Sequence, residues 1–332
     1  MKFLVCSAIL LGALSASLSA DASCAPLAAD CACESDCGSG FSFGANYLYW
    51  KAQQRELPTH EISHFTPISG TPAVDRSRTH VPDFDFESGF RVFGGYAIPC
   101  MFDLKLSYTY IPGESDYNLA PRSGEDPIDL LFSSVKGHWK ATFQYLDLDV
   151  SRTLQCAECL SVKPHIGFRA MWGDQKLKEE NILAEAFEFE GAPVNYTPIR
   201  GKECFHGYGV EGGLWAEWNV LCNFSLVGHV GGSILYTRMN HHTQFFFGSR
   251  VDDNTTIFSV SHNTQHVCDA IASLDYFVGV KYSDCMCGWN ITAQAGWESH
   301  VWFDLGNVAF DQGGSTGNFT TQGLTLGVAV GF

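Results

Sequence analysis

The sequence is poor in charged side chains, and positive ones are the scarcest. Charged residues make up 17% of the 332 positions, and 20 Lys and Arg stand against 36 Asp and Glu, a net charge of -16. Such an acidic chain lacks the basic surface that binds a phosphate backbone, so we exclude nucleic acid as a partner. Glycine (33 residues) and aromatic residues (14%) are plentiful instead, and this composition favours β-structure.

Long apolar runs are also missing once the N-terminus is passed. No later run reaches the 18 or more apolar residues of a transmembrane helix, which excludes a helical membrane span. The N-terminus itself is typical of an export signal, because Lys2 precedes the apolar stretch 3–14 and small residues follow. We therefore predict a signal peptide over residues 1–22 and a cysteine-rich periplasmic segment over residues 23–40. A lipidated Cys24 is the alternative, although its upstream residues fit a lipobox poorly.

Apolar and polar residues alternate through most of the remaining chain. In "FDLKLSYTYI", residues 102–111, Phe, Leu and Tyr alternate with Asp, Lys, Ser and Thr, so a strand here has one apolar and one polar face. The same period predicts ten strands, each close to the length that a tilted transmembrane strand needs. These predicted strands are 41–51, 90–98, 102–111, 138–150, 160–172, 208–218, 224–236, 270–282, 289–303 and 322–332.

The connections between these strands are alternately long and short. The first four long connections, which all fall at one end of the predicted sheet, are 52–89, 112–137, 173–207 and 237–269. A sandwich has no reason for this asymmetry, whereas a bacterial outer-membrane barrel has short periplasmic turns and long extracellular loops. Lipid also forbids open sheet edges. We therefore predict an all-β fold, a single antiparallel up-and-down transmembrane barrel over residues 41–332. It has about ten strands, or twelve if 243–247 and 255–260 form an added hairpin.

The polar face of these strands is expected to surround an aqueous interior whose charges set ion preference. The lumen-facing candidates are Arg91, Lys105, Lys140, Lys163, Arg169 and Lys281, with Asp103, Glu211, Glu217, Asp275 and Glu298. In 138–150 this assignment places Trp139 and Phe143 toward lipid and requires a bulge near Leu146, where the alternation slips. The alternative is a narrow interior filled by paired charges, with no open path.

Several motifs resemble known outer-membrane proteins. The strand "LTLGVAVGF" ends in the aromatic Phe332 and is similar to the signal that outer-membrane barrels present to their assembly machinery. "GFRVFGGYAI", "DLKLSYTYI", "YLDLDVSRTL" and "LSVKPHIGFRAMW" resemble the Legionella-type major outer membrane protein family across residues 41–220. That family includes proteins of chlamydia-like bacteria. The resemblance implies a surface-exposed porin for small hydrophilic solutes or ions, in contact with outer-membrane lipid.

Cysteine is frequent for an exported barrel, with 13 residues in the whole sequence. The disulfide candidates, which all fall on the predicted periplasmic side, are Cys24, Cys31, Cys33, Cys37, Cys100, Cys156, Cys159, Cys222, Cys285 and Cys287. Bridges within the chain and crosslinks to other envelope proteins both fit this placement. Crosslinks would stiffen the envelope, and they resemble the disulfide-linked outer-membrane complex of chlamydiae. No histidine has zinc-site spacing to these cysteines, so we predict no metal and no cofactor.

The sequence also bears on catalysis and on adhesion. The loop histidines form no recognisable catalytic dyad with nearby carboxylates, so we predict that the protein is not an enzyme; they are His241, His242, His262 and His266. The loop stretch "HHTQFFFGSR", residues 241–250, carries an aromatic cluster that suits contact with a host-cell surface. We expect a bacterial outer-membrane porin with stiffening or crosslinking cysteines. A surface adhesin or structural barrel without an open pore is the alternative.

Overall fold

Strands make up nearly all of the regular structure. The computed structural model describes residues 40–54, 60–68, 71–80, 84–98, 101–121, 132–157, 159–189, 191–221, 223–251, 254–286, 288–305 and 317–332. Within these ranges no helix is long and apolar enough to cross a membrane. The predicted signal peptide and nearly all of the predicted cysteine-rich segment lie outside the described residues.

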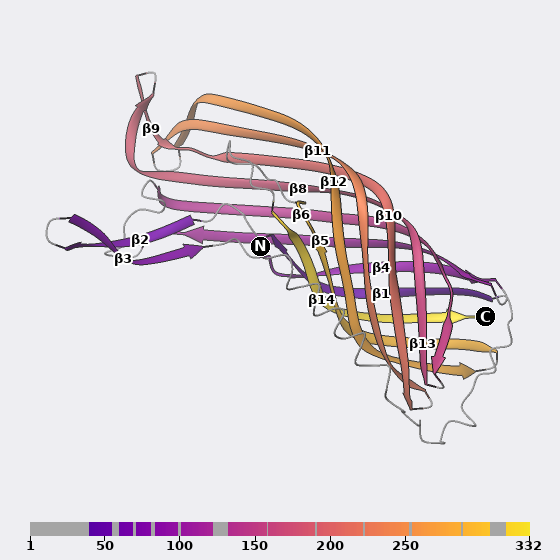
Figure 1. Ribbon diagram of the computed structural model, residues 1–332. Coiled ribbons are helices and arrows are strands. Elements are labelled where there is room, and N and C mark those ends of the chain that lie inside the picture. The colour runs from indigo at the N-terminus through magenta and orange to yellow at the C-terminus, as the bar shows by residue number, and fades with distance from the viewer. Residues whose placement is uncertain are drawn as a thin grey trace.

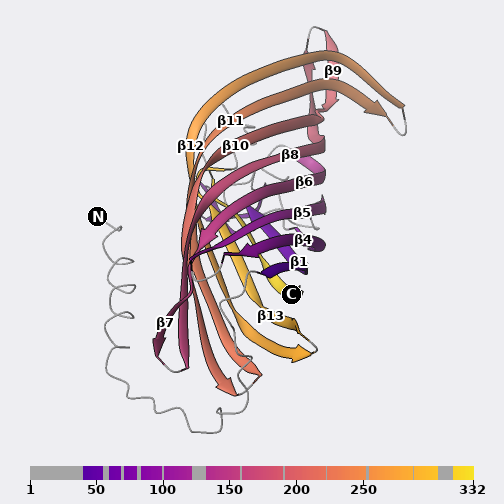
Figure 2. The same cartoon turned by 90° about the vertical axis from the view of Figure 1, so that its right-hand side faces the viewer.

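Ten antiparallel strands form a closed ring, as predicted. They are β1 (Gly40–Gln54), β4 (Phe86–Ala97), β5 (Asp103–Leu119), β6 (Phe132–Ser151), β8 (Leu160–Phe189), β10 (Ile199–Leu221), β11 (Phe224–Val251), β12 (Asn254–Met286), β13 (Trp289–Trp302) and β14 (Phe319–Gly331). Each ring strand pairs with its neighbours along the chain, and the pairing of β1 with β14 joins the first strand to the last. Closure leaves no open edge in the ring. Figures 1 and 2 show these long strands running side by side, with β11 and β12 bending strongly along their length.

Four short strands lie outside the ten-strand ring. The first outer connection contains a separate hairpin of β2 (His60–Ile68) and β3 (Thr71–His80), which projects beyond the barrel in Figure 1. At the short-turn end β7 (Leu154–Ala157) pairs with β8, and at the other end β9 (Ala192–Tyr196) pairs with β8 and β11. Much of the predicted outer loop 237–269 is strand, because β11 and β12 remain paired through "TQFFF" and "TTIFSV", with one register shift between Phe247 and Gly248. These stretches therefore lengthen existing ring strands and add no eleventh and twelfth member.

A band of exposed apolar side chains surrounds the half of the barrel nearest the short turns. On β5 the side chains of Leu106 and Tyr110 point outward, while those of Ser107 and Thr109 are buried inside. The alternation of 102–111 is thus an apolar face toward lipid, as predicted. Aromatic contacts mark both edges of the band, as an interfacial girdle does. They include Tyr49–Phe86, Phe90–Tyr110, Tyr108–Trp172 and Tyr208–Tyr236 at the outer edge, and Phe41–Tyr96, Phe224–Tyr282 and Trp289–Phe332 at the inner edge.

The alternation is reversed in the half of the barrel beyond this band. On β6, Leu146, Leu148 and Val150 face outward in the band, but farther along the strand the outward residues are polar, and Lys140 is among them. The predicted bulge near Leu146 is wrong, because β6 stays in register with both neighbours from Val135 to Ser151. The prediction that Lys140 faces the lumen is therefore also wrong. Beyond the lipid, the outward face is solvated and polar, and the enclosed face is apolar. The same residues in the alternation still point outward, but they are now the polar ones.

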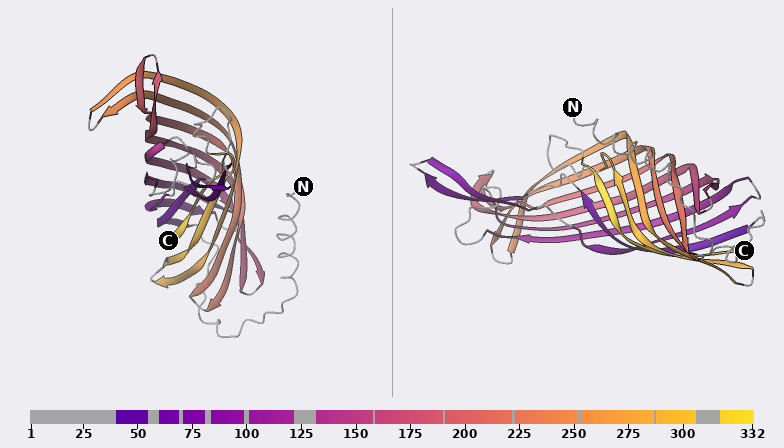
Figure 3. Two further views of the ribbon diagram at one scale, coloured as in Figure 1. Left: turned by 90° about the vertical axis from the view of Figure 1, so that its left-hand side faces the viewer. Right: turned by 60° about the horizontal axis from the view of Figure 1, so that its bottom comes forward.

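An apolar core fills the interior beyond the band. Its large side chains include Trp139, Phe143, Phe205, Trp302 and Phe319 from four ring strands and Phe84 before β4, each exposed by 3% or less. Phe143 and Phe319 stack with ring centroids 3.8 Å apart. Figure 3 shows from two further sides how the long strands curve around this space. The barrel is thus a packed structure at its outer half.

Candidate functional site

Arg91 forms the first centre of a buried charge network inside the barrel. Its guanidinium donates to both carboxylate oxygens of Glu298, at 2.8 and 3.2 Å. It also donates to the Tyr145 hydroxyl at 3.0 Å and to the Thr109 hydroxyl at 2.9 Å. Thr325 donates to Glu298 at 2.8 Å, which satisfies the carboxylate further. One arginine thereby connects strands β4, β5, β6 and β13.

Arg169 forms the second centre and binds three carboxylates at once. Its Nε donates to Asp147 at 2.7 Å, its Nη1 to Asp275 at 2.7 Å, and its Nη2 contacts Glu211 at 2.5 Å. The guanidinium also lies over the ring of Tyr145, 4.9 Å from its centroid. All three acids come from different strands, β6, β12 and β10. A planar fork of five donors is suited to this arrangement, since it can bond several carboxylates without changing its rotamer.

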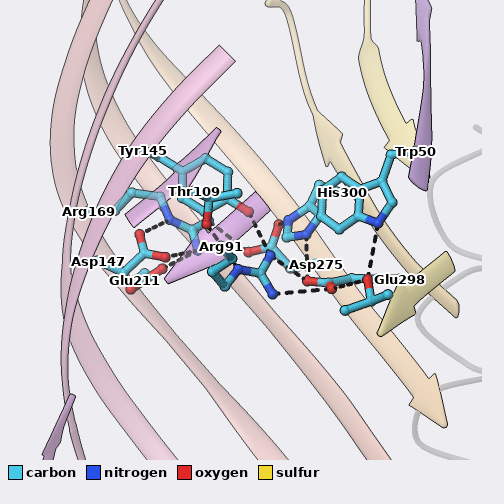
Figure 4. A network of polar contacts seen from close by, with 11 residues as sticks. Trp50, Arg91, Thr109, Tyr145, Asp147, Arg169, Glu211, Asp275, Glu298 and His300 are labelled. Atoms are coloured by element: carbon cyan, nitrogen blue, oxygen red, sulfur yellow. Dashed lines mark hydrogen bonds and ion pairs between the residues drawn. The ribbon is translucent and has the colours of Figure 1, made fainter. Parts of the chain in front are cut away.

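His300 joins the two centres. Its Nδ1 lies 2.8 Å from Asp275 and its Nε2 lies 2.9 Å from Glu298, as Figure 4 shows. Both ring nitrogens can donate only in the imidazolium form, so the geometry favours a charged His300. The network then holds three cations and four carboxylates, Asp147, Glu211, Asp275 and Glu298.

The network lies inside the lipid-facing band. Arg91 is flanked on its strand by the outward Phe90 and Val92, and Arg169 by the outward Phe168. Charges at this depth face a large desolvation cost and persist only when paired and hydrogen-bonded. Each arginine here has carboxylate partners and aromatic neighbours, so the network meets that condition. It locks opposite walls of the barrel together across the interior.

The structure places all the other predicted lumen residues on the inner face and brings most of them into pairs. Arg91, Arg169, Glu211, Asp275 and Glu298 meet in the network. Nearer the short turns, Lys163 pairs with Asp103 at 2.5 Å and Lys281 with Glu217 at 2.6 Å, and these pairs are partly exposed. Lys105 lies over the Phe93 ring, 4.9 Å from its centroid. The interior is therefore polar and accessible toward the short-turn end.

Sequence reasoning missed several members of the network. Asp147 was missed because the predicted bulge near Leu146 interrupts the alternation just before it. In the structure the alternation of β6 is unbroken, and Asp147 points inward with Tyr145. His300 follows Glu298 by two residues, so continuing the alternation of β13 would have found it. Trp50, whose ring nitrogen donates to Thr325 at 3.1 Å, lies on the inward face of β1 by the same rule. All three residues lie within the predicted strands, so the available signal was an unbroken alternation followed along each strand.

A second buried polar group lies inside the barrel beyond the lipid band. Glu203, Gln175 and His241 occupy one register row across β8, β10 and β11, and each is at most 5% exposed. Their side-chain atoms lack hydrogen-bond partners among the described residues, and the closest approach is 3.6 Å between His241 Nδ1 and Glu203. Burial raises the pKa of Glu203 to about 7 and lowers the pKa of His241. Protonation of Glu203 in this row therefore changes near neutral pH.

Cysteines at the short-turn end are in two states. Cys159 and Cys285 are disulfide-bonded, whereas Cys156 in β7 is an exposed free thiol. Cys204 and Cys268, on the outer halves of β10 and β12, are also free. The predicted disulfide residues that lie outside the described ranges are Cys24, Cys31, Cys33, Cys37, Cys100, Cys222 and Cys287. Connectivity therefore stays a prediction.

The histidines predicted to lie in the fourth outer loop fall on both faces of the strands beyond the band. His242 and His262 stack on adjacent strands with ring centroids 6.0 Å apart, whereas His241 points inside. In the aromatic stretch of β11, Phe247 stacks on Phe189 and Phe246 lies under Arg200, so these two rings are partly covered. A separate cluster, Glu114, Asp116 and His138, brings three potential metal-ligating atoms within 4.8 Å of one another on the outer surface. Sequence spacing did not indicate it, because β5 and β6 meet there only through their pairing.

The closed antiparallel ring, with its aromatic-edged apolar band and polar membrane-level interior, defines an outer-membrane β-barrel. The chain belongs to a family within this class, that of the Legionella pneumophila major outer membrane protein precursor, whose family model matches residues 33–332. The resemblance seen in the sequence is thereby confirmed, and membership implies an outer-membrane location. Comparison with curated proteins finds no match.

Solved structures of outer-membrane proteins are similar at low identity. The outer membrane protease OmpT from Escherichia coli has 9% identity and a TM-score of 0.46, with 88% of this chain and 96% of that chain covered. A major outer membrane protein from Thermus thermophilus has 12% identity and a TM-score of 0.32, with 89% and 100% covered. A Pseudomonas aeruginosa FadL homologue has 9% identity and a TM-score of 0.25, with 89% and 90% covered.

Proposed function

We propose that the protein is a structural barrel of the outer membrane whose interior is closed to solutes. The observation that carries this proposal is the apolar core beyond the charge network. Trp139 and Phe143 of β6 and Phe205 of β10 are almost fully buried among one another and their neighbours. Ten strands enclose an interior that side chains can fill. A hydrated solute would have to displace both this core and the ion pairs below it.

A porin for small hydrophilic solutes or ions is the second candidate. The partly exposed ion pairs Lys163–Asp103 and Lys281–Glu217 favour it, because they line a polar space on the short-turn side. Inward charges of this kind set selectivity in conducting barrels. For conduction, the contact between Arg91 and Glu298 would have to open, and the aromatic core would have to rearrange.

Conductance of the refolded full-length protein in a planar bilayer distinguishes the two functions. We expect no steady current steps from the wild type, with or without reductant. The triple variant Arg91→Ala/Trp139→Ala/Phe143→Ala should conduct, because it opens the contact with Glu298 and removes two large side chains from the core, while outward-facing Lys140→Ala should behave like the wild type. Steady wild-type steps whose ion preference changes in Glu298→Gln would overturn the closed barrel and support the porin.

The cysteines are assigned a role in stiffening or crosslinking the envelope. The support is local: Cys159 and Cys285 are disulfide-bonded, and Cys156 presents an exposed thiol at the same end of the barrel. A thiol at this end can meet a neighbouring envelope protein in an oxidising compartment. Non-reducing electrophoresis of intact outer membranes should show species larger than the monomer, reduced in amount in Cys156→Ser. A monomer band alone would remove the crosslinking role.

Attachment to a host-cell surface and catalysis have less support. The aromatic stretch of β11 is partly covered, since Phe246 and Phe247 already contact Arg200 and Phe189. That the protein is not an enzyme stays a prediction. Incubation with a peptide library tests it, and any specific cleavage by the purified wild type would contradict it.

A further inference from the structure

Cations gather on the outward face of β6, β8 and β10, beyond the aromatic edge of the lipid band. Lys140, Lys176 and Lys202 stand directly opposite one another on these three adjacent strands. In the next outward-facing row, His138, Lys178 and Arg200 are again in register. We call these six residues the basic patch. Lys140, Lys176, Lys178, Arg200 and Lys202 are all exposed.

The basic patch is unusual in a chain with only 20 Lys and Arg and a net charge of -16. Neighbouring strands lie about 4.8 Å apart, and like charges opposite one another destabilise a sheet. Among the described residues, the only ion pair of its five Lys and Arg side chains joins Lys176 to Asp174, at 3.4 Å. Arg200 covers the ring of Phe246, and Lys140, Lys178 and Lys202 have no carboxylate partner in the described part of the chain. His138 contacts Asp116 at 2.8 Å and Glu114 at 3.7 Å. The fold thus brings five Lys and Arg side chains together with only one carboxylate, Asp174, paired to them in the described part of the chain.

The position of the basic patch indicates which external anions would neutralise its Lys and Arg side chains. On β8 the patch begins at Lys176, four residues beyond Trp172 of the aromatic edge. At about 3.3 Å per residue and a tilt of about 45°, Lys176 lies roughly 9 Å above that edge. This is the level of lipid headgroups, and the side chains point outward, toward lipids that surround the barrel. On the β5 side, Glu114 stands opposite Lys140 and bounds the patch with negative charge.

We propose that the basic patch binds the phosphate groups of an anionic outer-leaflet lipid. Lysine ammonium groups bind phosphate as point charges, and a row of three gives a multiply phosphorylated headgroup several charge-assisted contacts. The proposal requires the barrel to lie in the outer membrane. It does not depend on whether the interior conducts.

Binding of lipid A to the purified full-length protein in detergent tests the proposal. The probes are bisphosphorylated lipid A, the same lipid after dephosphorylation, inorganic phosphate, and a heparin oligosaccharide. The variant is Lys140→Gln/Lys176→Gln/Lys202→Gln. Its control is Gln53→Glu/Thr320→Glu/Gln322→Glu, which makes the same charge change above the band on β1 and β14, on the opposite side of the ring. A heat-dependent shift in electrophoretic mobility verifies that each protein is folded.

The wild type and the control should bind bisphosphorylated lipid A at least tenfold more tightly than the lysine variant, and the dephosphorylated lipid should bind weakly to all three. Equal binding of both lipids, or wild-type affinity in the lysine variant, would overturn the proposal. So would lysine-dependent binding of inorganic phosphate or heparin without comparable lipid binding, because the patch would then recognise a free anion or a sulfated glycan.

Discussion

Arg91 of β4 holds Glu298 of β13 with two hydrogen bonds, although β1 and β14 lie between these strands in the ring. The contact therefore passes through the interior and not along the sheet. In the ring, each strand is hydrogen-bonded only to its two neighbours. The contacts of Arg91, Arg169 and His300 add bonds between strands that are not neighbours, and these bonds brace the barrel across its interior.

Breaking this contact should destabilise the barrel strongly. Arg91→Ala leaves Glu298 buried with His300 and Thr325 as its remaining partners. Loss of one member of a buried ion pair typically costs about 3–5 kcal/mol, and we expect a loss of this order in the free energy of unfolding. Urea titration in lipid vesicles, followed by tryptophan fluorescence, measures it.

Lys140→Ala serves as the control, since Lys140 is exposed and outside the network. A double variant, Arg91→Met/Glu298→Met, should recover much of the loss, because it removes both charges and leaves apolar groups of similar length. If Arg91→Ala unfolds at the same urea concentration as the wild type, the bracing role is wrong.

The aromatic core should be equally sensitive to truncation. Phe143 stacks on Phe319 at 3.8 Å and packs near Phe205 at 5.2 Å, so Phe143→Ala leaves a cavity between three strands. Removal of a buried Phe side chain typically costs about 3–5 kcal/mol. The same urea titration should show this loss, whereas the lipid-facing Leu148→Ala should lose much less. Comparable losses in the two variants would contradict a packed interior.

Within the lipid band, the sequence was sufficient to predict the strands and their faces. One parity must be apolar there, and the short, regular turns dictate an up-and-down order. The pattern of 102–111 is therefore found in β5 with the predicted orientation. The ten ring strands likewise correspond to the ten predicted segments.

Beyond the band, the same reasoning failed for a physical reason. An alternating strand shows which of its two faces is apolar. It does not show whether that face contacts lipid outside the barrel or a packed core inside it. Parity therefore predicts Trp139 and Phe143 toward lipid and Lys140 toward the lumen, whereas the two aromatic side chains lie inside and Lys140 lies outside. The partners in the charge network were also out of reach, because Arg91 and Glu298 meet only through the closure and tilt of the whole ring.

The buried row of Glu203, Gln175 and His241 should make the free energy of unfolding depend on pH. Burial raises the pKa of Glu203 from 4.5 to about 7, so the folded protein binds a proton that the unfolded chain has already lost between these values. Stability from this group is full below pH 4.5 and falls as the pH rises toward 7. The pKa of His241 is lowered, so its contribution has the opposite sign and weakens as the pH falls below 6.5.

Glu203→Gln should remove the pH dependence that comes from Glu203 and leave the one that comes from His241. Between pH 5 and pH 8 the wild type should lose more stability than this variant, by an amount on the order of 2–3 kcal/mol at about 1.4 kcal/mol per pKa unit. Urea titrations at a series of pH values measure the difference. The exposed Glu185→Gln provides the matched control on β8. Parallel pH profiles for Glu203→Gln and the wild type would show that Glu203 ionises normally.

Phe332 should matter more for assembly than for final stability. It exchanges two backbone hydrogen bonds of 2.9 Å with Phe41, and its ring contacts Phe41, Phe43 and Trp289 beside the junction of β1 and β14. Its side chain remains 55% exposed on the lipid-facing side, so truncation leaves no sealed cavity. If this residue is an assembly signal, Phe332→Ala should lower the amount of folded protein in cells severalfold. Refolding of the same variant into detergent should reach nearly the wild-type yield.

Two controls separate a signal from ordinary packing. Phe43→Ala removes another lipid-facing ring from the same aromatic group and should leave the cellular level close to that of the wild type. Phe332→Trp keeps an aromatic group and should restore assembly. The amount of folded protein is measured from its unheated electrophoretic band. Equal losses for Phe332→Ala in cells and in detergent would assign Phe332 to packing at the junction, because a recognition signal has no effect when the assembly machinery is absent.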